Sequence, residues 1–160
     1  MNKDFNESVM RRIAVYAQQT SEEGVGGPFG AAIVKDGNVV CITCNRVLAD
    51  NDPTAHAEIT AIREACKLLN TYDLAGCELY CTGAPCPMCL SAIIWANIRT
   101  VYFCNDYEGA ARIGFRDDHI YKYLRMPDPS ESSLVTQYRV EVPEGKELYD
   151  AYITNQHTIY

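Results

Sequence analysis

Apolar residues recur along the chain at two different spacings, which predict helices in some stretches and strands in others. Near the N-terminus they fall three or four residues apart, the period of an amphipathic helix, at Phe5, Val9, Ile13, Tyr16 and Ala17. Glycines at positions 24, 26 and 27 end this helix. A second helical pattern covers 55–69, and a third begins at prolines 85 and 87, which a helix tolerates only in its first turn.

Runs of β-branched and apolar residues predict strands at 29–34, 39–44, 78–82 and 100–104. Asp36-Gly37 lies between the first two runs and is a strong hairpin signal, so these two strands are expected to pair antiparallel. Later in the chain, a further strand is expected at 134–140 and a helix at 144–157. Helices that alternate with strands favour an α/β fold, in which a three-layer αβα sandwich surrounds a mixed sheet.

Composition limits the class of protein. The 160 residues are 48% apolar and 22% charged, which suits one globular domain that needs neither metal nor disulfides to fold. The net charge of −7, with no cluster of cations, disfavours binding to nucleic acid or to an anionic membrane. The polar N-terminus and the lack of an apolar run of about 18 residues predict no signal peptide and no membrane span. We therefore expect a cytoplasmic protein with reduced thiols.

Eight cysteines include two Cys-x-x-Cys pairs. Cys41 and Cys44 lie on a predicted strand, where a spacing of three places the side chains on opposite faces, so both are expected to pack as small apolar residues. Cys86 and Cys89 lie at a predicted helix start, where the same spacing places both thiols on one face. The partial positive charge of a helix N-terminus favours the thiolate form that binds metal.

His56-Ala57-Glu58, at the start of the second predicted helix, completes a candidate metal site. His56, Cys86 and Cys89 form the three-ligand set of a catalytic zinc, which keeps its fourth position for water. Glu58 is expected to face that water rather than the ion, as a proton shuttle, because residues two apart on a helix do not share a face. The alternative is a structural Cys3His zinc, with its last thiol from Cys66, Cys77, Cys81 or Cys104.

The combination of His-x-Glu with Pro-Cys-x-x-Cys resembles the signature of the zinc nucleobase and nucleoside deaminases. The resemblance extends beyond the ligands and is closest to the bacterial guanine deaminases of the cytidine deaminase fold. It covers most of residues 1–125 and is carried by the segments 26–36, 51–58, 85–90, 95–96 and 114–118.

The resemblance implies a five-stranded sheet, one zinc per chain and a homodimer. The chain would be a single deaminase domain over 1–160, whose C-terminal segment, 134–160, can be exchanged between the two partners. The resemblance also assigns four side chains to contact with the substrate, namely Phe29, Asn45, Asp117 and Tyr160.

The reaction implied is hydrolytic deamination of a free nucleobase, guanine first, which gives xanthine and ammonia. Two positions depart from the family pattern near the base: Ala84 replaces an acidic residue before Pro-Cys, and Arg116 stands where the bacterial guanine enzymes tend to carry an acid. Cytosine, isocytosine and a nucleoside such as guanosine are therefore alternative substrates. Enzymes that deaminate tRNA adenosine share the zinc signature, but they need a cationic surface to bind the RNA backbone. The remaining alternative, a non-catalytic domain with a structural zinc, would give Glu58 no role.

Overall fold

The computed structural model of the protein describes residues 5–128, 132–155 and 157–159. The chain divides into two compact units, Met1–Tyr121 and Lys122–Tyr160. The first unit contains a four-stranded sheet with helices on both faces, and the second contains the helix α7 (Pro143–Thr154). Each helix in the described part of the chain is too short or too polar to span a bilayer.

The sheet is mixed, as predicted, with the strand order β2-β1-β3-β4. The strands are β1 (Gly30–Lys35), β2 (Asn38–Cys44), β3 (Cys77–Gly83) and β4 (Thr100–Asn105). β1 pairs antiparallel with both β2 and β3, whereas β3 and β4 are parallel. The turn residues Asp36 and Gly37 have φ values of 50° and 75°, so the predicted hairpin is confirmed together with its left-handed turn.

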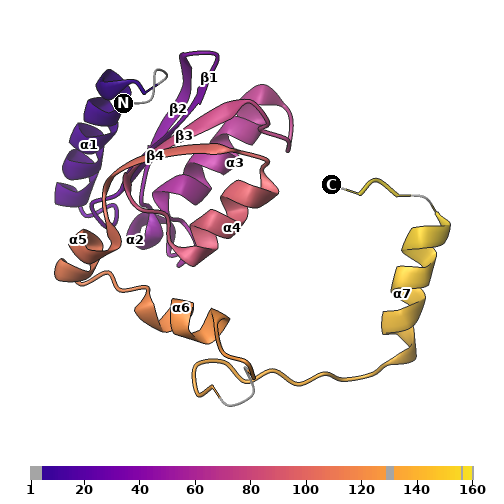
Figure 1. Ribbon diagram of the computed structural model, residues 1–160. Helices are drawn as coiled ribbons and strands as arrows, with labels where there is room; N and C mark the ends of the chain where they lie inside the picture. The colour runs from indigo at the N-terminus through magenta and orange to yellow at the C-terminus, as the bar shows by residue number, and fades with distance from the viewer. Residues whose placement is uncertain (1–4, 129–131, 156, 160) are drawn as a thin grey trace. The chain divides into compact units, whose positions relative to one another are not determined.

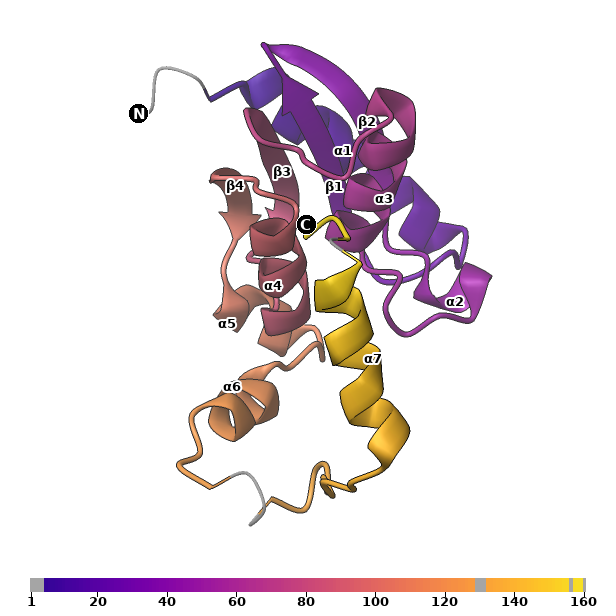
Figure 2. The ribbon, with the colours of Figure 1, turned by 90° about the vertical axis from the view of Figure 1, so that its right-hand side faces the viewer.

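Helices cover both faces of the sheet (Figure 1). The helix α1 (Glu7–Glu22) lies on one face, and α3 (Ala57–Leu69) and α4 (Pro87–Trp95) lie on the other, as Figure 2 also shows. Successive side chains of a strand point to opposite faces, so β1 contributes to two cores. Ala32 and Val34 pack with residues of α1, while Ala31 and Ile33 pack with alanines of α3. The predicted three-layer arrangement is therefore confirmed.

The two strand cysteines lie on opposite faces, as expected. The Cys41 thiol donates to the carbonyl of Ala61 in α3 at 3.5 Å. Cys44 is buried and lies near Tyr16 of α1. The pair therefore packs between the sheet and its helices and does not form a metal site.

The expectation of a five-stranded sheet is wrong, because the sheet has four strands in the part of the chain that the structure describes. Residues 134–140 are not a strand, and their apolar side chains are exposed. A run of high β-propensity becomes a strand only where another strand pairs with its backbone. The helix expected at 144–157 is present as α7, which ends at Thr154. The described chain also has three short helices: α2 (Val47–Asp50), α5 (Tyr107–Arg112) and α6 (Asp118–Leu124).

Candidate active site

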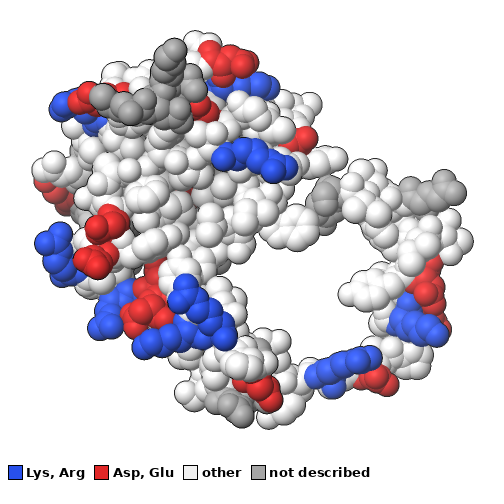
Figure 3. Space-filling view, viewed as in Figure 1, with Lys and Arg blue, Asp and Glu red and all other residues white. Residues whose placement is uncertain are grey.

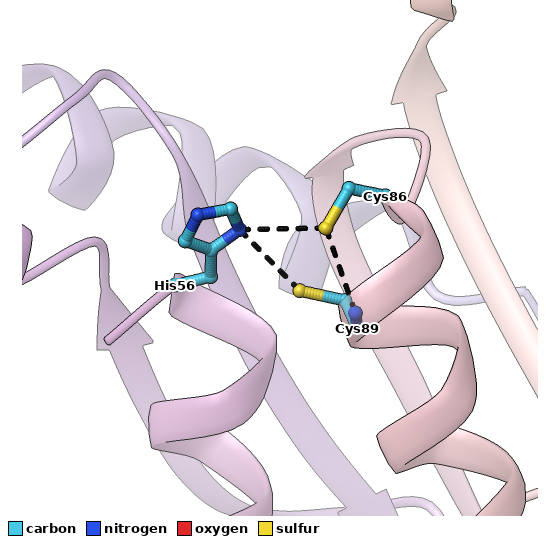
Figure 4. Close-up of side chains that lie close together, drawn as sticks. All are labelled: His56, Cys86 and Cys89. Atoms are coloured by element: carbon cyan, nitrogen blue, oxygen red, sulfur yellow. Dashed lines mark hydrogen bonds between the residues drawn. The ribbon is translucent and has the colours of Figure 1, made fainter. Parts of the chain in front are cut away.

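The three expected metal ligands converge at the edge of the sheet where β2 and β3 end (Figure 4). His56 is the N-cap residue of α3, with an extended backbone that directs its ring away from the helix body. Cys86 is the N-cap residue of α4, and Cys89 lies in the first turn of the same helix. Two helix N-termini on one face of the sheet therefore bring together residues that are 30 or more positions apart.

The geometry of these side chains fits zinc. His56 Nδ1 lies 3.6 Å from Cys86 Sγ and 3.5 Å from Cys89 Sγ. Tetrahedral bonds of ordinary zinc–nitrogen and zinc–sulfur length place such atoms about 3.6 Å apart. Among the residues that the structure describes, no further His, Cys, Asp or Glu joins this group. The alternative Cys3His site is therefore wrong, and the donor set is the three-ligand kind.

The thiols are prepared for metal by their own hydrogen bonds. The bond from Cys89 lowers the pKa of Cys86 to about 4, with a further lowering from the His56 ring, so Cys86 is a thiolate at neutral pH. The pKa of Cys89 is raised, because its proton is held between the two sulfurs and the group is buried. The backbone N–H of Cys89 also donates to Cys86 Sγ at 3.5 Å, which orients that sulfur toward His56.

Glu58 lies beside the ligands without being one of them. Its side chain is 7% exposed, and burial raises the pKa of its carboxyl group. The neighbouring Cys89 thiol acts in the opposite direction and lowers that pKa by a smaller amount. A buried carboxyl group whose pKa moves toward neutrality both accepts and donates protons efficiently. The position therefore suits the proton shuttle that the sequence predicts.

A cavity of about 320 Å³ opens beside the ligands, and Glu58, His56 and Cys86 form part of its wall. Three of the four residues expected to contact substrate line the same cavity, namely Phe29, Asn45 and Asp117. The fourth, Tyr160, lies outside the described residues. The structure thus brings together every described residue of the expected site.

The hairpin places Phe29 and Asn45 side by side, one just before β1 and the other just after β2. The backbone N–H of Asn45 donates to the Phe29 carbonyl at 2.8 Å, which extends the ladder of the two strands by one pair. The side-chain oxygen of Asn45 accepts from the backbone N–H groups of Gly27, at 3.3 Å, and Val47, at 3.1 Å. Both acceptor sites of this oxygen are thereby used, so Asn45 presents its amide N–H group to the cavity.

The opposite wall comes from the segment between α5 and α6, where the sequence has no clear period. Phe115 lines the cavity and meets the Phe29 ring edge to face, with centroids 4.9 Å apart. No motif in the sequence assigns this residue to the site, although it lies in the segment 114–118 that carries the resemblance. Asp117 is half-buried, and burial raises the pKa of its carboxyl group. Arg116 also reaches the cavity wall, and its Nε donates to Asp118 at 3.1 Å.

Comparison with known proteins supports this assignment of the site. Residues 3–105 match the family described as the cytidine and deoxycytidylate deaminase zinc-binding region. Guanine deaminase of Bacillus subtilis (strain 168) is 43% identical over 147 residues, which are 92% of this chain and 93% of that protein.

The X-ray structure of guanine deaminase from Bacillus subtilis superposes with a TM-score of 0.87 at 42% identity, and covers 96% of this chain and 95% of that one. The tRNA-specific adenosine deaminase of Aquifex aeolicus (strain VF5) is 45% identical over a shorter stretch of 103 residues, 64% of this chain and 66% of that protein. The resemblance inferred from the sequence motifs is therefore confirmed.

Proposed function

The chain belongs to the zinc-binding family of cytidine and deoxycytidylate deaminases, and we propose that it is a guanine deaminase. In the reaction, guanine and water give xanthine and ammonia. The observation that carries the proposal is the placement of a buried carboxyl group, Glu58, against a three-ligand metal set inside a cavity large enough for a purine base. Similarity over nearly the whole chain to a guanine deaminase supports the choice of base.

Zinc held by His56, Cys86 and Cys89 would supply a Lewis acid that makes water a nucleophile near neutral pH. Glu58 then moves the protons. Its carboxylate accepts a proton from the water that attacks C2 and delivers it to N3, the unprotonated ring nitrogen beside C2. It then carries the remaining proton of that water, from the hydroxyl group on C2, to the amino group, which leaves as ammonia while the C2 carbonyl forms. Burial suits Glu58 for this task, because bulk water does not compete for the proton.

The remaining cavity residues fit a guanine ring. Asn45 offers only a donor, so it selects a base edge that accepts, such as a carbonyl oxygen or an unprotonated ring nitrogen. Asp117 accepts from ring N–H or amino groups. Phe29 and Phe115 provide apolar surface for the flat ring. Tyr160 remains a proposed contact that closes the cavity.

Deamination of tRNA adenosine is the less favoured function. The phosphate backbone of RNA requires a stripe or patch of cations. The chain instead carries a net charge of −7, and on the face drawn in Figure 3 the basic and acidic side chains are interspersed. We propose a small nucleobase as the substrate and no nucleic acid partner.

The proposed assembly is a homodimer that exchanges residues 134–160. Two apolar surfaces of the chain support it. In α7, described side chains such as Leu148, Tyr149 and Ile153 are exposed. In α4, which is apolar on all sides, Leu90, Ile94 and Trp95 are exposed as well. We also propose a cytoplasmic location, because the eight cysteines are free thiols, which a reducing compartment maintains.

A substrate panel tests the proposed function. Purified protein with one zinc per chain is incubated with guanine, adenine, cytosine, isocytosine and guanosine, and released ammonia is measured. We expect the highest kcat/KM with guanine. Zinc-loaded protein that releases no ammonia from any of the five compounds would contradict the proposal, and preference for another base would correct the substrate. Light scattering on the same sample measures the mass of the assembly.

A further inference from the structure

Tyr107 joins α5 to the loop that precedes the metal ligand Cys86. It is the first residue of α5, and Asp106, the N-cap residue, fixes the start of that helix through a bond from the Gly109 N–H at 2.8 Å. The Tyr107 hydroxyl donates to the carbonyl oxygen of Pro85 at 3.2 Å. Pro85 is buried and directly precedes Cys86 in the chain.

Tyr121 of α6 packs against Tyr107 in turn. The two rings meet edge to face with centroids 5.7 Å apart. Burial, together with the neighbouring Tyr107, raises the pKa of Tyr121 to about 12. The ring contact restricts the positions that the Tyr107 ring can take, and so keeps its hydroxyl group at the Pro85 carbonyl.

This contact lies one peptide unit away from a metal ligand. The Pro85 carbonyl belongs to the peptide unit that joins Pro85 to Cys86, and that unit sets the direction of the Cys86 side chain. Proline has no N–H, so the carbonyl is its only backbone group that can be held by a hydrogen bond. On the other side, the sulfur of Cys86 is oriented by the Cys89 N–H. The ligand is thus fixed from both ends.

We propose that Tyr107, held by Tyr121, is a positioning residue for the zinc ligand Cys86. The inference rests on the proposed function only in taking the ion to be zinc, and it concerns residues to which the sequence motifs give no role. Loss of the Tyr107 hydroxyl would leave a buried carbonyl without its donor and the preceding peptide free to rotate. Cys86 would then spend less time in the direction that the metal needs.

The test compares three substitutions in the full-length, zinc-loaded protein: Tyr107→Phe, which deletes the hydroxyl group, Tyr121→Leu, which deletes the ring that packs on Tyr107, and the control Tyr138→Phe, whose side chain is 85% exposed. A chromogenic chelator in excess reports the rate of zinc release. Outer contacts that orient metal ligands are typically worth a factor of about 10 or more in affinity, so we expect release about tenfold faster for Tyr107→Phe. Tyr121→Leu should give a smaller increase, and Tyr138→Phe should match the wild type.

Kinetics with guanine give a second measurement. For Tyr107→Phe we expect a lower kcat with an unchanged KM, and excess zinc should restore most of the kcat. Release of zinc from Tyr107→Phe at the control rate would overturn the inference, and so would a lower melting temperature with unchanged release, which indicates a purely structural role. A wild-type protein that holds zinc but does not act on guanine would contradict the proposed substrate, whereas faster release from Tyr107→Phe in that protein would still support the inference.

Discussion

The Gly27 N–H donates to the side-chain oxygen of Asn45, and this bond decides which half of the Asn45 amide faces the cavity. A second bond, from the Val47 N–H, holds the same oxygen. The loop after α1 and the loop after β2 thus fix one donor that faces the cavity. Backbone N–H groups therefore determine that Asn45 offers a hydrogen-bond donor to the cavity, and its amide group is not free to rotate.

Replacement of Asn45 by Asp tests this arrangement. An aspartate oxygen can accept the same two backbone bonds, but the other oxygen offers guanine an acceptor where the amide offered a donor. We expect kcat/KM for guanine to fall about 10- to 100-fold, because a lost or repelled hydrogen bond costs about 1–3 kcal/mol. Ammonia release measures the change. An unchanged kcat/KM, with zinc content equal to that of the wild type, would contradict a role of Asn45 in binding.

Gly26 allows Asn45 to take this position. A Cβ atom added to Gly26 would overlap both the side-chain oxygen and the backbone carbonyl of Asn45. We therefore expect Gly26→Ala to displace Asn45 and to raise the KM for guanine, with a lower melting temperature because backbone atoms must also move. Gly145→Ala is the matched control, since a Cβ there meets only an ordinary contact at 3.5 Å. Equal KM values for the two variants would exclude a steric role of Gly26.

Glu58→Gln separates metal binding from proton transfer. Glu58 is not among the ligand atoms, so the variant should bind one zinc per chain. It cannot carry a proton, so kcat should fall by about 100- to 10,000-fold. Glu64→Gln, on the same helix and outside the cavity wall, should keep the wild-type rate. Metal analysis and ammonia release on the same samples decide the matter, and a Glu58→Gln protein that retains full activity would remove Glu58 from the mechanism.

The cysteine half of the metal site could be predicted from the sequence because its geometry is local, whereas His56, 30 residues before Cys86, was joined to it by its chemistry and by the family signature. Cys86 and Cys89 share one helix start, and Pro85 and Pro87 mark that start unambiguously. The hairpin could also be predicted from the sequence, because Asp36-Gly37 favours a turn with positive φ angles, which few other turns require. In both cases a short stretch of chain determines its own backbone.

The parts that escaped prediction depend on distant contacts. Residues 134–140 have strand-like composition, yet their conformation depends on whether another strand pairs with them, which composition does not reveal. Phe115 lies in a segment without period, and its place in the cavity wall is set by packing against Phe29, more than 80 residues earlier. The short helix α2 follows the end of a strand and has no buried residue, so no pattern of apolar positions predicts it.

The Phe29–Phe115 pair predicts that Phe115 contributes to binding rather than to chemistry. Edge-to-face aromatic pairs contribute about 0.5–1.5 kcal/mol beyond the area that they bury. We therefore expect Phe115→Leu to raise the KM for guanine about three- to tenfold, while kcat changes less. Phe103→Leu, half-exposed on β4 and outside the cavity wall, is the control. A fall in kcat alone, without a change in KM, would assign Phe115 a different role.

Acid should release the metal, because protons and zinc compete for the same atoms. The pKa values of Cys89 and His56 are both raised, chiefly by their hydrogen bonds with Cys86, so these two groups tend to hold protons that zinc must displace. Cys86, with a pKa of about 4, contributes none near neutrality. Zinc affinity should therefore fall as the pH falls from about 8 to about 6, by about 10- to 100-fold per pH unit for one to two displaced protons. Competition with a chelator across this range measures how zinc affinity depends on pH. Cys104→Ser is the control and should show the same dependence as the wild type. A zinc affinity that does not change with pH would contradict ligation by these residues.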